Sequence, residues 1–262
     1  MAQIFAIVNQ KGGVGKTTTT LNLGAYLANA GKRVLIVDLD PQGNASSGIG
    51  INHREVEHGL YEALVGHSTV DQALHETNHE GLHIIPTNQS LAGASVELVG
   101  HDNREFVLHK VLEPLKEKYD FILVDCPPSL GLLTLNGLVA SDQVVIPIQA
   151  EYYALEGLGQ LLNTIELVRD NLKPELNVFG AVITMYDQRT KLSKDVLTEL
   201  YKHFPNKIFR SVIPRSVRLA EAPSFGQTIL GYDPKSKAAR AYERLTNEFL
   251  LRDEEHRETE TL

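Results

Sequence analysis

A glycine-rich turn near the start of the chain carries residue types that bind phosphate. Residues 9–18 read NQKGGVGKTT and lie between an apolar run and a helical pattern. The glycines allow backbone N–H groups to point inward around phosphate oxygens, and the amino end of the following helix adds partial positive charge. Lys16 can reach the terminal phosphates of a nucleotide, and the Thr17 hydroxyl can bind Mg²⁺. The pattern therefore predicts a phosphate-binding loop with these contact residues: Lys11, Gly12, Gly13, Val14, Gly15, Lys16, Thr17 and Thr18.

The first of these residues is a second lysine in a loop that needs only one. Lys11 stands at the second position of the ordinary loop pattern, GxxxxGK[ST], where a neutral residue is sufficient. Its residue type alone leaves open a solvated surface lysine.

Three aspartates follow apolar runs that read as strands. Asp38 and Asp40 lie in VDLDPQGNAS, two residues apart, and Asp125 lies in FILVDCPPS. If the first strand continues, Asp38 and Asp40 point to the same side of its carboxyl end. An isolated aspartate is more often a turn former or a helix cap. Three of them at strand ends beside a phosphate loop favour Mg²⁺ binding and in-line attack of water on a γ-phosphate. We predict Thr17, Asp40 and Asp125 as the metal-binding residues and Lys16 as a catalytic residue.

Strand and helix patterns alternate along the chain. The nearly continuous apolar runs predict buried parallel strands at 4–9, 33–40, 82–88, 121–128, 143–149, 178–187 and 208–214. Helical patterns at 17–30 and 104–119 separate some of them. This alternation predicts an α/β fold, with a doubly wound, mostly parallel sheet covered by helices on both faces and ligands at the carboxyl ends of the strands, as in P-loop NTPases.

Composition limits the class of protein. The 262 residues, with 42% hydrophobic and 22% charged, favour one globular domain over residues 1–252 and an acidic, flexible tail over 253–262. A single cysteine, Cys126, and the absence of a signal-peptide pattern favour a cytoplasmic protein. We expect no membrane anchor, because no apolar stretch approaches about 18 residues.

Five segments together resemble one family of ATPases. KGGVGKTT is the deviant Walker A signature of the ParA/MinD group, and VDLDPQGNAS, DFILVDCPPSLGLLTLN, VITMYDQRT and IPRSVRLAEAPSFGQ resemble its Soj-type partition ATPases. The resemblance implies that ATP and Mg²⁺ are the cofactors and that ATP is hydrolysed. It also implies a nucleotide-sandwich homodimer in which Lys11 reaches the partner's phosphates. The resemblance thereby adds Lys11 and Asp40 to Lys16 as predicted catalytic residues.

The resemblance assigns further roles near the nucleotide. It implies that Asp40 orients the attacking water, that Asp38 lies in the same switch segment, and that the loop at Gly131 senses the γ-phosphate. Met185 and Pro214 would pack on the adenine, while Asp187 would accept a hydrogen bond from it. For Glu151, a place at the dimer interface and a simple helix-start acid remain equally open.

Other members of the wider group fit less well. One cysteine cannot hold the cluster of the nitrogenase iron protein or of ApbC-type carriers. A MinD-like membrane-surface ATPase would end in a basic amphipathic helix, unlike residues 253–262. Two alternative hypotheses are kept: a MinD-like membrane-surface ATPase, and an ATP-dependent amidotransferase or synthetase that acts on a small molecule. The resemblance favours a partition ATPase whose dimer binds nucleoid DNA without sequence preference and whose hydrolysis a ParB-type partner stimulates.

The distribution of charge is consistent with a DNA-binding surface. The chain carries a net charge of −8, yet residues 189–244 hold 12 Lys or Arg against 5 Asp or Glu, a local charge of +7. Such asymmetry is typical of a basic surface on an acidic protein, although a solvated face would have the same composition. The resemblance points first to Arg189 and Arg218. The supporting candidates are Lys207, Lys235, Lys237 and Arg240.

Overall fold

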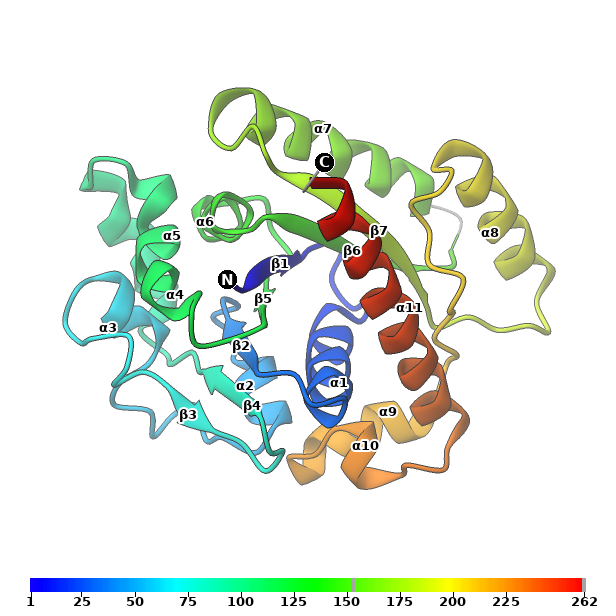
Figure 1. Ribbon diagram of the computed structural model, residues 1–262, viewed down its shortest axis with the longest axis horizontal. Helices are drawn as coiled ribbons and strands as arrows, with labels where there is room; N and C mark the ends of the chain where they lie inside the picture. Colours follow the sequence, from blue (N-terminus) through cyan, green and yellow to red (C-terminus); the bar gives the residue numbers. More distant parts are fainter. Residues whose placement is uncertain (152–153, 261–262) are drawn as a thin grey trace.

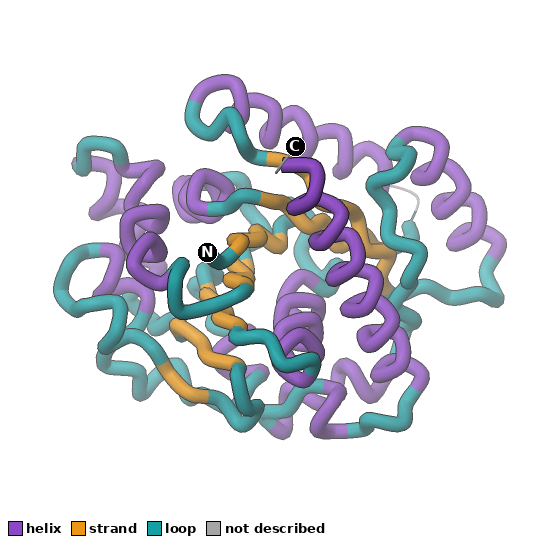
Figure 2. Tube along the Cα trace, viewed as in Figure 1, coloured by secondary structure: helices purple, strands orange, loops and turns teal. Residues whose placement is uncertain are grey.

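The computed structural model describes residues 1–151 and 154–260 and has a central, mostly parallel sheet (Figures 1 and 2). Within these residues the sheet has seven strands in the order β3-β4-β2-β5-β1-β6-β7. Only β3 is antiparallel to its neighbour. The bounds of the strands are β1 Gln3–Ile7, β2 Val34–Asp38, β3 His75–Glu76, β4 Leu82–Ile85, β5 Phe121–Asp125, β6 Gln143–Gln149 and β7 Asn177–Thr184. β2 and β5 are buried at every position, which explains their uninterrupted apolar sequences.

Helices cover both faces of the sheet, as the alternating pattern predicted (Figure 1). Successive residues of β1 enter different cores: Ile4 and Ala6 pack on one side, Phe5 and Ile7 on the other. The first core includes residues of α3 to α8, and the second includes residues of α1, α2, α10 and α11. The helices are α1 Lys16–Asn29, α2 Asn44–Gly48, α3 Leu60–Leu64, α4 Leu91–Glu97, α5 Val107–Leu112, α6 Leu132–Ala140, α7 Ala154–Asn171, α8 Lys191–His203, α9 Val217–Glu221, α10 Ile229–Tyr232 and α11 Lys237–Glu260. The doubly wound α/β fold is therefore confirmed.

The predicted helix over 104–119 is broken into three pieces. A 3-10 turn, η2 (Arg104–Phe106), precedes α5, and a second, η3 (Glu113–Leu115), follows it. Pro114 lies in η3; it cannot donate a backbone hydrogen bond and it restricts the residue before it. Short 3-10 turns (η1 Leu98–Gly100 and η4 Ala222–Phe225) also follow α4 and α9.

The predicted strand over 208–214 is wrong. The segment runs beside β7 but forms only isolated bridges, between Ala181 and Ile208 and between Tyr186 and Pro214. In the middle of the segment, the N–H groups of residues 210 and 211 donate to the Glu248 carboxylate of α11, at 2.7 and 2.8 Å. Because a side chain takes these donors, the backbone ladder to β7 is interrupted.

The predicted flexible tail also differs from the structure. α11 continues through 253–260, and residues 261–262 lie outside the described residues. Asp253 is buried and its Oδ2 accepts a hydrogen bond from Arg257 at 2.9 Å, while the His256 ring lies 5.5 Å from the Phe179 ring. The acidic end of the chain therefore packs against the second core as part of a helix.

Aromatic rings join α11 to the sheet. The Phe249 ring is fully buried and lies 4.8 Å from the rings of Phe5 and Phe179 and 5.7 Å from that of Phe121. These contacts come from three different strands, so one side chain of α11 fixes the helix against the centre of the sheet.

We predict that Phe249→Ala lowers the free energy of unfolding by about 3–5 kcal/mol, because it leaves a cavity among these rings. Phe225→Ala is the matched control, since Phe225 is 64% exposed and stacks on Tyr232; its cost should be about 1 kcal/mol or less. Urea unfolding followed by circular dichroism measures both. Equal losses for the two variants would contradict the assigned role of Phe249.

Candidate functional site

The predicted phosphate loop is a tight turn between β1 and α1. Gly13 and Gly15 have φ angles of 73° and 88°, in the left-handed region that favours glycine. α1 begins at Lys16, and no side chain caps its amino end, so the first N–H groups of the helix stay available to an anion. The Thr184 hydroxyl at the end of β7 donates to the carbonyl of Val14 at 2.7 Å and fixes the loop to the sheet.

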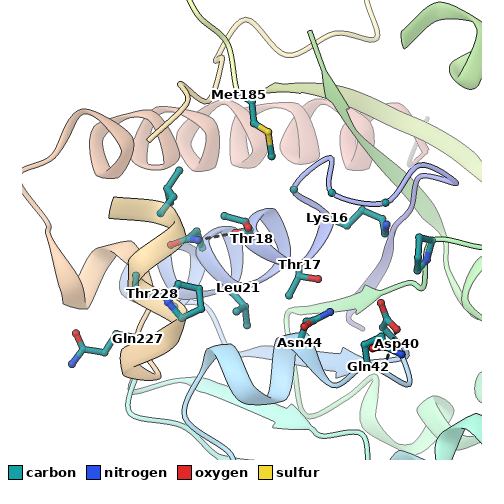
Figure 3. Close-up of a pocket in the computed structure, with 18 residues that line it drawn as sticks. Lys16, Thr17, Thr18, Leu21, Asp40, Gln42, Asn44, Met185, Gln227 and Thr228 are labelled. Carbon is teal, nitrogen blue, oxygen red and sulfur yellow. Dashed lines mark hydrogen bonds between the residues drawn. The ribbon is translucent and has the colours of Figure 1, made fainter. Parts of the chain in front are cut away.

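A cavity of about 390 Å³ opens over this loop (Figure 3). Lys16, Thr17 and Asp40 lie at one end, and Gln227 and Thr228 lie at the other (Figure 3). A smaller pocket of about 180 Å³ adjoins the cavity, shares residues of the loop with it, and is lined by Met185, Pro214 and Tyr242 among others. The combined space is typical of a site for a small organic ligand.

Lys16 is positioned to meet negative charge inside the cavity. Its side chain is buried, and its ammonium lies 3.4 Å from the carbonyl oxygen of Lys11 across the loop. Burial lowers the pKa of Lys16, while the nearby Asp125 and Asp40 act in the opposite direction. A phosphate would replace solvent around an ammonium that the loop already holds in place.

Asp125 connects β5 to two turns of α1. Its fully buried carboxylate accepts hydrogen bonds from the hydroxyls of Thr17, at 2.7 Å, and Thr20, at 2.9 Å. Burial raises the pKa of Asp125 to about 6, against the effect of these two donors and of Lys16. A carboxylate and a hydroxyl at this distance are the oxygen ligands that Mg²⁺ prefers, so Thr17 and Asp125 fit a magnesium site.

Asp38 and Asp40 have different partners, and β2 does not continue to Asp40, which was the condition for both side chains to point to the same side. β2 ends at Asp38, whose carboxylate accepts from the backbone N–H of Ser46 at 2.8 Å and from its hydroxyl at 2.6 Å. Burial, followed by the charge of Asp125, raises the pKa of Asp38 to about 7. Asp40 instead lines the cavity, and its Oδ1 accepts from the N–H of Gln42 at 3.0 Å. Asp38 therefore anchors α2, and Asp40 is the carboxylate that faces the cavity.

Lys11 lies outside the cavity and pairs within its own chain. Its Nζ is 2.5 Å from Oε2 of Glu151, and both side chains are more than two-fifths exposed. The neighbouring Gln10 bonds Gly157 and Gln160 of α7, so the outer side of the loop rests on the start of that helix. Gly131 immediately precedes α6, and Pro128 of the preceding turn lines the cavity.

The residues predicted to bind the base separate into two groups. Met185 and Pro214 line the smaller pocket, where Met185 has a left-handed φ of 51°. Asp187 lies elsewhere: its carboxylate accepts two hydrogen bonds from the Arg189 guanidinium, at 2.9 and 2.7 Å. This pairing lowers the pKa of Asp187 to about 2 and engages both of its carboxylate oxygens.

Sequence reasoning missed several lining residues. Thr184, Leu219 and Tyr242 contribute to the smaller pocket, and Gln227 and Thr228 close the larger one. The segment IPRSVRLAEAPSFGQ was recognised, but its helical turns were not predicted. Tyr242 lies in α11, far along the chain from the phosphate loop, and no local sequence pattern indicated that it would line the pocket.

A basic groove of about 820 Å³ lies beside the smaller pocket. Its cations are Arg189, Arg215, Lys237, Arg240 and Arg244, of which Arg215 and Arg244 were not predicted. Among the residues that the structure describes, no carboxylate lies within ion-pair distance of Arg215, Lys237, Arg240 or Arg244. The groove shares Pro214 and Arg215 with the smaller pocket.

The other predicted DNA contacts lie outside this groove. The Lys207 Nζ donates to the carbonyl oxygen of Val178, near the start of β7, at 2.8 Å. Partial burial lowers the pKa of Lys207. Arg218 pairs with Glu221 at 3.1 Å and with Asp233 at 3.6 Å. Lys235 is exposed but does not line the groove.

The two buried carboxylates generate a prediction about pH. The pKa values of Asp38 and Asp125 are raised from 3.8 to about 7 and about 6 in the folded protein. Between about pH 4 and pH 7 the folded state therefore binds more protons than the unfolded state, and stability falls as the pH rises. Without nucleotide and magnesium, Asp38→Asn should reduce this decline, as measured by urea unfolding at a series of pH values. The exposed control Asp102→Asn should retain it; an unchanged slope in Asp38→Asn would refute the assignment.

Comparisons with known proteins agree with this geometry. Residues 2–178 match the AAA domain family. Sporulation initiation inhibitor protein Soj of Bacillus subtilis (strain 168) is 54% identical over 248 residues, covering 95% of this chain and 98% of that protein. Chromosome-partitioning ATPase Soj of Treponema pallidum (strain Nichols) is 50% identical over 253 residues, covering 97% of this chain and 99% of that protein.

A solved structure shares the whole fold. Cobyrinic acid a,c-diamide synthase from Mycobacterium smegmatis, with bound ADP and magnesium, matches with a TM-score of 0.83 and 39% identity, over 94% of this chain and 93% of that one. The sequence matches extend from the phosphate loop through the basic groove, because they cover nearly the entire chain. The chain therefore belongs to the Soj/ParA family of chromosome-partitioning ATPases.

Proposed function

We propose that ATP and Mg²⁺ assemble this protein into a homodimer that binds duplex DNA without sequence preference and releases it on hydrolysis. The observation that carries the proposal is the basic groove, which shares Pro214 and Arg215 with the smaller pocket that adjoins the cavity over the phosphate loop. The family relationship supports the role in chromosome or plasmid partition. A ParB-type partner would stimulate hydrolysis, and DNA binding would place the protein on the nucleoid in the cytoplasm.

The residues of the cavity fit a bound nucleotide triphosphate and its metal. The loop N–H groups and Lys16 would hold the phosphates, while Thr17, Asp125 and Asp40 would hold Mg²⁺ directly or through water. When bound, the metal ion neutralises charge on the β- and γ-phosphates. Asp40 faces the cavity and would orient the attacking water for in-line displacement at the γ-phosphate. Met185 and Pro214 would pack against the base in the smaller pocket.

Lys11 supports an ATP-dependent dimer because its side chain lies outside its own cavity. To act on a partner's phosphates it must leave Glu151. An exposed ion pair contributes only about 0–1 kcal/mol, whereas charge-assisted hydrogen bonds to phosphate are stronger. The exchange of a carboxylate for a partner's phosphate is therefore favourable once ATP is present.

Two alternatives remain distinguishable. The name of the synthase structure makes ATP-dependent amide formation on a small molecule a second candidate; that activity would depend on an added substrate and ignore DNA. A MinD-like membrane-surface role is less supported, because the carboxyl end of α11 is acidic and would be repelled by anionic lipid. In the described part of the chain, no helix combines the length and hydrophobicity needed to cross a bilayer.

The experiment that tests the proposal is retention on a duplex of arbitrary sequence with ATP, with ADP and without nucleotide, across a salt series. Retention should require ATP and weaken steeply with salt, since backbone contacts release counterions. Binding by a monomer is expected at about 10⁻⁴–10⁻⁶ M, and a dimer doubles the contacts. Failure to bind with any nucleotide would reject the proposal.

For the groove, we predict that Arg215→Ala combined with Arg240→Ala weakens DNA retention at least about tenfold. The salt dependence should also fall, because fewer counterions are released from the DNA when fewer phosphates are contacted. Lys110→Ala is the control, an exposed lysine on α5. Unchanged retention of the double variant would remove this groove from the DNA interface.

For the dimer, we predict that Lys11→Ala binds ATP but remains a monomer when examined by analytical ultracentrifugation. The matched variant Glu151→Gln, which frees Lys11 from its own chain, should still dimerise with ATP. A stable ATP-dependent dimer of Lys11→Ala would refute the role of Lys11 toward the partner.

A further inference from the structure

The basic groove contains one carboxylate, and that carboxylate is fully engaged with one of its arginines. Asp187 Oδ1 accepts from the Arg189 backbone N–H at 3.0 Å and from its Nε at 2.9 Å, while Oδ2 accepts from a terminal guanidinium nitrogen at 2.7 Å. This is the forked arrangement in which an arginine also binds a phosphate. The pair therefore uses one forked face of the guanidinium, the same face that would bind a DNA phosphate.

The two side chains differ in their freedom to move. The Arg189 side chain is 89% exposed, whereas that of Asp187 is 24% exposed. The turn that follows β7 fixes Asp187, because its carbonyl oxygen accepts from the N–H of Thr190 at 3.2 Å and from the Thr190 hydroxyl at 3.1 Å. Asp187 is thus held by the turn, whereas the Arg189 guanidinium is exposed enough to meet an anion from outside the protein.

The remaining cations of the groove are in a different situation. Arg215, Lys237, Arg240 and Arg244 have no ion-pair partner among the described residues, and Arg189 alone is held by a carboxylate. Arg215 is close enough to contribute to the low pKa of Asp187, which keeps this carboxylate ionised throughout the physiological pH range.

We propose that Asp187 competes with DNA phosphates for Arg189 and so limits the affinity of the groove for DNA. This inference rests on the proposed function, because the competing ligand is the phosphate backbone of a duplex. In the free protein Asp187 occupies the guanidinium; in the complex a phosphate must displace it. The residue therefore sets binding strength without contacting the nucleic acid.

Asp187→Asn tests the proposal with little change in shape. The asparagine oxygen can still accept from the N–H of residue 189, so the turn is retained, but the charge is lost. We expect the variant, held as a dimer with a non-hydrolysable ATP analogue, to bind a short duplex about two- to fivefold more tightly per protomer, the value of an exposed ion pair. Fluorescence anisotropy measures the affinity, and the thermal midpoint verifies folding.

Two further variants separate release of Arg189 from a general charge effect. In an Arg189→Ala background, Asp187→Asn should have little effect, because there is no guanidinium left to release. Asp71→Asn removes an exposed carboxylate that pairs with Lys118 near the opposite edge of the sheet, and it should not change the affinity.

Each outcome has a definite meaning. Equal or weaker binding by Asp187→Asn would overturn the inference and make Asp187 a residue that positions Arg189. The same gain in the Arg189→Ala background, or in Asp71→Asn, would also overturn it in favour of simple repulsion. Absence of DNA binding by the unaltered protein would reject the proposed function itself, and the inference with it.

Discussion

Two carboxylates buried side by side are the constraint on which the site depends. Asp38 and Asp125 end neighbouring parallel strands and are aligned in register. Burying a carboxylate is costly unless hydrogen bonds compensate it. The donors are Thr17 and Thr20 of α1 for Asp125, and Ser46 of α2 for Asp38. Burial of the two carboxylates is therefore compensated only when α1 and α2 are in place to donate these hydrogen bonds. The same contacts fix the phosphate loop and the segment that carries Asp40.

Much of this architecture was predictable because its signals are local. A continuous apolar run is enough to indicate a strand buried on both faces, as in β2 and β5. The phosphate loop was predictable because glycine spacing, a preceding strand and a following helix all lie within about one βα unit. The proximity of Thr17 and Asp125 followed from the same reasoning, since the carboxyl ends of parallel strands meet at one edge.

The structure departs from what composition suggests where another residue competes for the same group. Segment 208–214 has the composition of a strand, but Glu248 of α11 takes its central N–H donors. Asp187 has the chemistry to bind a base, but the Arg189 guanidinium donates hydrogen bonds to both of its carboxylate oxygens. Lys207 has the charge to bind DNA, but its ammonium donates a hydrogen bond to the carbonyl oxygen of Val178. Composition indicates what a residue can do, and only the three-dimensional arrangement decides which partner it has.

The charges along α11 oppose the dipole of that helix. Lys237, Arg240 and Arg244 lie near its amino end, which is already partly positive, and the acidic run 253–260 lies at its partly negative carboxyl end. This order weakens the isolated helix, which is held by packing through residues such as Phe249. The separation of basic and acidic residues along α11 creates a long-range electrostatic field, which orients the groove toward an approaching polyanion and the acidic end of the helix away from it. The rate at which the protein meets such a polymer is therefore set by charges spread over a whole helix, and this rate falls as salt screens them.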